Sequence, residues 1–168
     1  MRSLSSAAFG LTLAWGGAVY LVATFVGRRW IHRHGMRGTV ARGAAFTLGG
    51  GLLALVATWV HEGGLWWLLA AQALYSFGHG MHQPCGQAGA VGPFPEKAGT
   101  AASLSGFWMT AMAFMVGLFL GRSSGTSLYP MTLGFSTLAF ALCVVAWTLV
   151  RWHGEPQAAP REAQASPA

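Results

Sequence analysis

Long apolar stretches alternate with short polar segments along the whole chain. Between charged residues, the apolar stretches cover residues 3–27, 43–60, 63–95, 98–121 and 123–150. A helix needs about 20 predominantly apolar residues to span the hydrocarbon core of a bilayer. The pattern therefore predicts an all-α integral membrane helical bundle over residues 1–152, with five transmembrane helices near 6–27, 43–61, 65–91, 99–120 and 129–150.

Composition agrees with a membrane protein and argues against a soluble domain. Of the 168 residues, 54% are hydrophobic and only 8% are charged, and aspartate is absent. Soluble domains carry about a quarter charged residues. The net charge of +6 could suggest a nucleic-acid partner, but five of the ten lysines and arginines lie between Arg28 and Arg42, and the apolar stretches carry none. This placement is typical of a loop at a membrane surface, so we expect no nucleic-acid partner.

The lysines and arginines predict an orientation in the membrane. Five predicted spans place eight of them on one side and two, Arg2 and Arg122, on the other. The eight are Arg28, Arg29, Arg33, Arg37, Arg42, Lys97, Arg151 and Arg161. Because cytoplasmic loops carry an excess of these residues, we expect the amino terminus outside and the carboxyl terminus in the cytoplasm. The Pro/Ala-rich residues 153–168 read as a disordered cytoplasmic tail.

A polar stripe runs along the third predicted span. Its members recur at steps of three and four residues and are Gln72, Tyr75, Ser76, His79 and Gln83. That spacing puts them on one side of a helix. Polar groups facing lipid lose their hydrogen bonds to water, so we expect the stripe to face protein or a wet cavity. These five residues are our candidates for lining a substrate cavity.

The same span is rich in residues that weaken a helix. Gly78, Gly80 and Pro84 follow one another closely, and kinks at such places are tolerated where neighbouring groups satisfy the freed backbone. One interpretation is a bendable helix that gates a cavity. The other is a helix kinked only for packing.

Two histidines and a cysteine in this span raise the question of a metal site. His79, His82 and Cys85 step by three residues, so they drift around the helix by roughly 60° at each step. A metal needs three or four ligands that converge, and all four glutamates lie outside the predicted spans. We therefore predict no metal site and no haem. Paired carboxylates and a Ser/His/Asp set are also missing, so we expect no enzyme.

Small residues and prolines mark the start of the fourth predicted span. Gly99 and Ser103 lie four residues apart, as do Ala102 and Gly106, and such spacing lets two helices approach closely. Before them, two prolines break the preceding helix. The second and fifth spans are instead apolar nearly all round, which favours contact with lipid.

The junction before the fourth span resembles a known family of transporters. It reads "GQAGAVGPFPEKAGTAASLSGF", and its matching positions are Pro93, Pro95, Ala98, Gly99, Thr100, Ala101, Ser103 and Gly106. Together with the Arg-rich segment, it resembles the carboxyl-terminal half of a major facilitator superfamily transporter. The likeness extends over residues 3 to about 152 and is greatest to drug:proton antiporters of the bicyclomycin/chloramphenicol-resistance (Bcr/CflA) type.

The resemblance implies a fold and a function. The five spans would be the eighth to twelfth helices of a twelve-helix protein, that is, most of its second six-helix repeat, in a bacterial-type inner membrane. The chain would be the carboxyl-terminal part of an exporter of small amphipathic compounds, completed by amino-terminal helices or a partner chain. We expect no cofactor, since the proton gradient would supply the energy by alternating access.

Proton coupling marks a departure from the family. In the family, carboxylates within the membrane carry out proton coupling. None of the predicted spans of this chain contains a carboxylate. The coupling group would then lie in the missing part, or His79 would serve, because imidazole titrates near neutral pH. An alternative is a small homo-oligomeric membrane protein of five helices without transport activity.

Overall fold

The computed structural model describes residues 5–61, 64–123 and 129–153, and in these ranges the chain is almost entirely helical, without a strand. The predicted all-α fold is thus confirmed. The elements are α1 (Ser6–His61), α2 (Leu65–Val91), the short 3-10 helix η1 (Pro95–Lys97), α3 (Ala98–Ser123), α4 (Tyr129–Trp147) and α5 (Leu149–His153). Of the tail predicted to be disordered, residues 154–168 lie outside the described ranges.

α1 consists of two helical arms joined by a bend at Gly35. The backbone of Gly35 has φ 70° and ψ 175°, a combination that is essentially restricted to glycine. On either side of it the chain is helical, so the Arg-rich segment 28–42 is not the open loop expected between the first two spans. Apart from its two glycines, the segment offers no helix breaker, and arginine is a good helix former. The turn is therefore confined to a single residue.

Three helices are long and apolar enough to cross a membrane within the residues that the structure describes: Ser6–Val60, Pro95–Arg122 and Tyr129–Trp152. A straight helix of 55 residues would be about 80 Å long, against a hydrocarbon core of about 30 Å. The bend at Gly35 divides it into two arms, each of spanning length. α2 has 27 residues but is not among the three, because its polar stripe lowers its hydropathy. The count of five spans stays a prediction.

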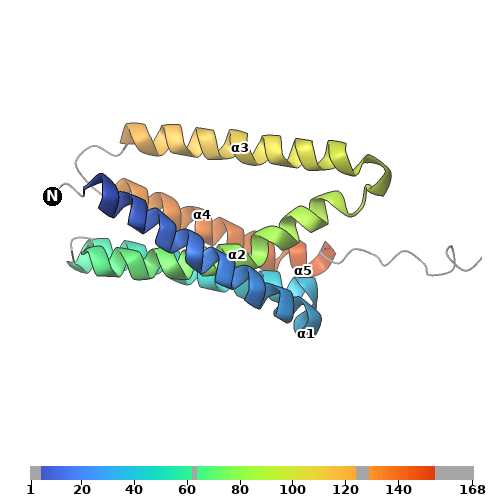
Figure 1. Ribbon diagram of the computed structural model, residues 1–168, viewed down its shortest axis with the longest axis horizontal. Helices are drawn as coiled ribbons and strands as arrows, with labels where there is room; N and C mark the ends of the chain where they lie inside the picture. The colour runs from blue at the N-terminus through green and yellow to red at the C-terminus, as the bar shows by residue number, and fades with distance from the viewer. Residues whose placement is uncertain (1–4, 62–63, 124–128, 154–168) are drawn as a thin grey trace, which may run out of the picture.

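The helices run back and forth along one long direction (Figure 1). The bend of α1, η1 and α5 lie toward one end, and α1 begins at the other. Of the eight described lysines and arginines, seven belong to that bend, to η1 or to α5, and the eighth is Arg122 near the end of α3. The cations thus gather at one end of the molecule.

Glycines let α2 pack closely against both arms of α1. A Cβ atom on Gly78 would lie 2.4 Å from the carbonyl oxygen of Gly43, and one on Gly50 would lie 2.4 Å from the backbone nitrogen of Tyr75. On the other arm, a Cβ atom on Gly80 would lie 2.5 Å from the carbonyl oxygen of Tyr20. Contact between small residues is the usual way in which helices associate inside membranes.

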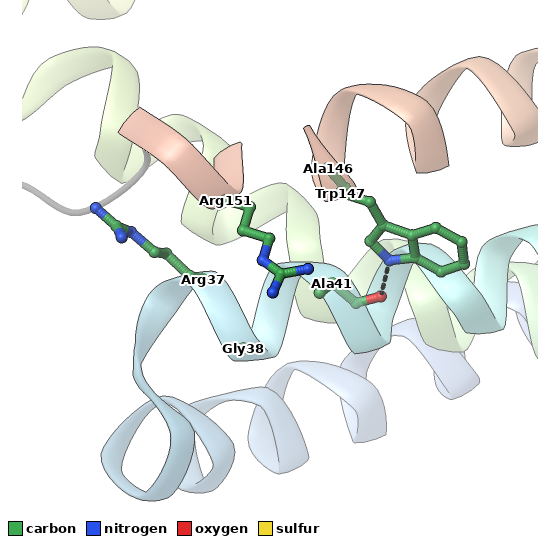
Figure 2. A pocket seen from close by; sticks show the side chains of 6 residues that line it. All are labelled: Arg37, Gly38, Ala41, Ala146, Trp147 and Arg151. Atoms are coloured by element: carbon green, nitrogen blue, oxygen red, sulfur yellow. Dashed lines mark hydrogen bonds between the residues drawn. The ribbon is translucent and has the colours of Figure 1, made fainter. Parts of the chain in front are cut away.

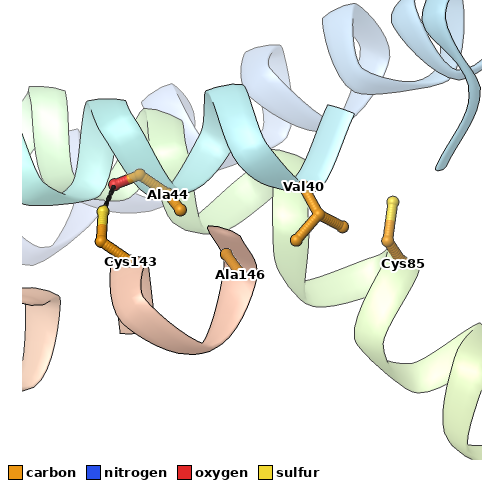
Figure 3. Packing of buried hydrophobic residues seen from close by; sticks show 5 residues of the cluster. All are labelled: Val40, Ala44, Cys85, Cys143 and Ala146. Carbon is orange, nitrogen blue, oxygen red and sulfur yellow. Dashed lines mark hydrogen bonds between the residues drawn. The ribbon is translucent and has the colours of Figure 1, made fainter. Parts of the chain in front are cut away.

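α4 packs against the second arm of α1 through small and weakly polar residues. The hydroxyl of Ser136 donates to the Gly51 carbonyl at 2.7 Å, and the thiol of Cys143 donates to that of Ala44 at 3.0 Å. Cys143 belongs to a buried cluster with Val40, Ala44, Cys85 and Ala146 (Figure 3). Both cysteines are free and buried, as packing residues should be.

This arrangement corrects in part the expectation that the second and fifth predicted spans face lipid: one side of each packs against protein, while large apolar side chains such as Val56, Leu138 and Phe140 are exposed. The second arm of α1 lies between α2 and α4, and α4 itself buries five residues. The buried residues of α4 are Thr132, Ser136, Ala139, Cys143 and Ala146. Because they are small, they do not stand out from the large apolar residues around them, and the helix reads as apolar on all sides.

α3 lies apart from the other helices in Figure 1. None of the residues in its most apolar stretch is buried. The side chains of Phe107, Phe114 and Phe119 are all about two-thirds exposed. The described part of the chain therefore leaves most of the surface of α3 uncovered.

Candidate functional site

The polar stripe of α2 faces the first arm of α1. All five of its side chains are half-buried. The amide nitrogen of Gln72 donates to the Thr12 carbonyl at 3.2 Å, and near the other end the hydroxyl of Tyr20 donates to the amide oxygen of Gln83. The structure thus places the stripe in a contact between helices.

His79 lies at the centre of the stripe among aromatic rings. Its ring centroid is 5.8 Å from that of Tyr20, 6.5 Å from that of Tyr75 and 5.1 Å from that of His82. No described residue forms a hydrogen bond with His79. Its ring nitrogens are thus available to a proton or to a polar group of a ligand.

His82 has a different environment, because a hydrogen bond holds its ring. It is 8% exposed, and its Nε2 atom lies 3.2 Å from the hydroxyl oxygen of Thr47, which is fully buried. The Thr47 hydroxyl also lies 3.1 Å from the Gly43 carbonyl, to which it donates. Which of the two atoms, the Thr47 hydroxyl or the Nε2 atom of His82, donates in this pair depends on the tautomer of the imidazole. His82 is thus held by a hydrogen bond to the neighbouring helix.

The cysteine does not turn these histidines into a metal centre. Within the described residues, no three of the histidine, cysteine, aspartate and glutamate side chains lie close enough to hold a metal ion. The thiol of Cys85 instead lies 3.5 Å from the Met81 carbonyl in its own helix.

Pro84 is accommodated inside α2 with help from α1. Proline has no N–H group, so the carbonyl of Gly80, four residues earlier, loses its usual helical donor. The hydroxyl of Thr24 lies 3.4 Å from this carbonyl and 3.0 Å from that of Tyr20, and its one proton serves both. A neighbouring helix thus satisfies the group that the proline leaves free, which agrees with both interpretations of this segment.

The junction with prolines adopts a compact turn at the end of the molecule. Pro93 and Pro95 are exposed, and Pro95 begins η1. In the first turn of α3, the hydroxyl of Ser103 donates to the carbonyls of Gly99 (3.0 Å) and Thr100 (3.1 Å). A Cβ atom on Gly99 would meet nothing within 4 Å, and the same holds for Gly106. Among the described residues, no second helix packs on this surface of small residues.

A cavity of about 540 Å³ lies between α2, α3, α4 and the second arm of α1. Its polar lining consists of His82, Gln83, Gln87 and Ser105, and the rest is largely apolar. The amide nitrogen of Gln87 lies 2.6 Å from the sulfur of Met109, and the hydroxyl of Ser105 lies 3.4 Å from the amide oxygen of Gln87. Gln87 is not among the predicted cavity residues, although it continues the stripe four residues after Gln83.

Comparisons with known proteins give one partial match. Over 56 residues the chain is 45% identical to multidrug resistance protein D of Escherichia coli (strain K12). The match covers 33% of this chain and only 14% of that protein. The chain matches no protein-family model, and no solved structure matches it.

The apolar helices of the described residues indicate a multi-pass membrane protein. The matched protein bears the name of a multidrug resistance protein and not that of an enzyme.

Proposed function

We propose that this chain is the carboxyl-terminal part of a proton-coupled exporter of small amphipathic compounds, a drug:proton antiporter of the major facilitator superfamily. The partial match to a multidrug resistance protein supports the proposal. The resemblance of the junction between α2 and α3 to the same transporters supports it further. Its five spans would cross the inner membrane with the cationic end in the cytoplasm.

One observation carries the assignment of a site: the row of polar side chains on α2, half-buried inside an otherwise apolar bundle. Polar and ionisable groups within a membrane are costly and mark the pathways of substrates and ions. We assign the contact with the substrate to Gln72, Tyr75, Ser76, His79 and Gln83. His79 is the centre of this site, because its nitrogens form no hydrogen bond within the described part of the chain.

Proton coupling can be assigned to His79 or to a part of the transporter outside this chain. The only acidic residue that the structure describes is Glu96 in η1, at the very start of the segment Pro95–Arg122, so α1, α2, α3 and α4 contain no described carboxylate. An imidazole titrates in the physiological range, so it can exchange a proton for the drug when the site changes its exposure from one side to the other.

The test uses cells that carry the natural locus with a tag at the carboxyl end. An immunoblot first gives the size of the product, which is 17.7 kDa for this chain alone. Accumulation of a fluorescent amphipathic cation is then compared between wild type, a deletion, His79→Ala and the control His32→Ala. His32 is an exposed histidine outside the stripe. We expect the deletion and His79→Ala to raise accumulation, and His32→Ala to behave as wild type.

The outcomes separate the function from its site. Unchanged accumulation in the deletion strain would contradict the exporter. A deletion that raises accumulation, combined with a His79→Ala variant that exports normally, would leave the exporter in place and refute the role of His79.

A second candidate is a homo-oligomeric membrane protein without transport activity. The exposed surface of α3 favours it, because a second copy of the chain could cover that surface. Crosslinking in native membranes tests this candidate. It predicts crosslinked bands at multiples of the monomer mass together with unchanged dye accumulation in the deletion strain.

A further inference from the structure

A second pocket lies at the cationic end of the molecule, away from the polar stripe. It has a volume of about 410 Å³ and forms where the bend of α1 meets the end of α4 and the start of α5. Its lining residues are Arg37, Gly38, Ala41, Ala146, Trp147 and Arg151 (Figure 2). The indole nitrogen of Trp147 donates to the Ala41 carbonyl at 3.2 Å and so ties α4 to α1 beside the pocket.

The two arginines of this pocket have no anionic partner in the described part of the chain. Arginine stays charged at every physiological pH. The Nε atom of Arg37 is buried and has no hydrogen-bond partner among the described residues. Glu96, the only described carboxylate, does not line the pocket. A buried donor of a charged group that stays unpaired is destabilising, so an acceptor supplied by a ligand would satisfy it.

Two other arginines near the bend contact aromatic rings instead. Arg42 lies over the ring of Trp30, with its guanidinium carbon 5.7 Å from the ring centroid, and Arg28 lies 6.0 Å from that of Phe25. In Figure 2 the guanidinium of Arg151 points toward Ala41 and Trp147. The guanidinium of Arg37 points away from these two residues. The two guanidinium groups thus lie apart, which lowers their mutual repulsion, and the exposed Arg151 is accessible to an anion.

We propose that this pocket binds the phosphate group of an anionic lipid headgroup. The planar fork of an arginine matches phosphate oxygens, and basic pockets between transmembrane helices on the cytoplasmic side suit such headgroups. Tryptophans of this kind favour the membrane interface, where the headgroup lies. Free inorganic phosphate offers the same oxygens, so the experiment must distinguish the two sources. The site is independent of the proposed transport.

The experiment measures binding of a short-chain phosphatidylglycerol to the full chain in a neutral detergent by native mass spectrometry. The test variant is R37Q/R151Q. The control R29Q/R33Q removes the same charge from two exposed arginines that do not line the pocket. We expect the affinity to fall about 30-fold in the test variant and less than about 3-fold in the control.

Further arms address the source of the phosphate and the folding of the variant. Phosphatidylcholine should bind about as weakly to wild type as phosphatidylglycerol does to the test variant. Competition by excess inorganic phosphate, but not by chloride at equal ionic strength, would support the phosphate site and assign it to a soluble anion. If R37Q/R151Q aggregates, R37K/R151K keeps the charge but loses the fork and should bind with intermediate affinity. Equal losses in the test and control variants, or wild-type affinity in R37K/R151K and R37Q/R151Q, would overturn the proposal.

Discussion

Replacing Gly78 by alanine tests the close packing between α2 and the second arm of α1. The added methyl group would lie 2.3 Å from the Thr47 hydroxyl oxygen and 2.4 Å from both the Gly43 carbonyl oxygen and the Thr47 backbone nitrogen. Ordinary contacts of a Cβ atom begin near 3.4 Å. Two of the three atoms belong to the backbone of a helix, so they cannot rotate away. The two helices would have to separate by about 1 Å.

The size of the effect follows from this separation. Overfilling a packed site costs about 1 to 3 kcal/mol, and rigid backbone on the opposite side places this site at the upper end. Moving α1 away also weakens the hydrogen bond between Thr47 and His82, which contributes about 1 kcal/mol. We expect a loss of about 3 kcal/mol, which lowers the melting temperature of a 168-residue chain by about 6 to 12 °C.

The assay uses the two native cysteines as reporters of unfolding. Cys85 and Cys143 are 3% and 2% exposed, so a thiol-reactive fluorogenic dye labels them only when the helices separate. The matched control is Gly86→Ala on the same helix, where a Cβ atom meets nothing within 4 Å. It should melt about 2 to 4 °C higher than wild type, because alanine favours a helix over glycine. Equal melting temperatures for Gly78→Ala and wild type would refute the close contact.

Two other substitutions probe the special backbone positions with the same melting assay. Thr24→Val removes the hydroxyl that donates to the Gly80 carbonyl and should lower the free energy of unfolding by about 1 to 3 kcal/mol. The control is Thr137→Val, because Thr137 is exposed and its hydroxyl bonds only within its own helix; it should leave the free energy of unfolding unchanged. Equal effects of the two would contradict the role of Thr24. Gly35→Ala places a side chain in a backbone conformation that is essentially restricted to glycine, and should lower the free energy of unfolding by about 1 to 3 kcal/mol. The control Gly17→Ala lies in a regular helical position with open space around it and should not destabilise the protein. A wild-type melting temperature for Gly35→Ala would mean that the bend has another cause.

The third predicted span shows what a periodic pattern can reveal. Its predicted range, 65–91, is also the range of α2, and its polar stripe lies in a contact between helices. Steps of three and four residues fix the side of a helix on which a group lies, whatever the rest of the fold. The partner could not be predicted, because the residues that meet the stripe, such as Thr12 and Tyr20, are 60 and 63 positions away from Gln72 and Gln83.

Positions that depend on small residues were harder to predict. The second arm of α1 and α4 read as apolar on all sides, yet both are packed through glycine, alanine, serine and cysteine. Glycine and serine have hydropathies near neutral, and those of alanine and cysteine are positive, so these residues do not form a clearly polar side among the large apolar ones that face outward. The reverse happened at the start of α3, where Gly99 and Gly106 predicted a close contact but lie open. Small residues four positions apart indicate that a second helix can pack closely there. Whether one does depends on the rest of the assembly.

The order of contacts along the chain has a consequence for synthesis. α1 and α2 follow each other directly, so they can pair as soon as both have left the ribosome. α4 reaches α1 only later, since Ser136 bonds to a carbonyl 85 residues earlier. At about 5 to 20 residues per second, roughly 4 to 17 seconds of translation separate the two bonded residues. Until Ser136 and Cys143 have been synthesised, the carbonyls of Gly51 and Ala44 lack these two donors. During this time the nascent chain is open to capture by a chaperone or an insertase.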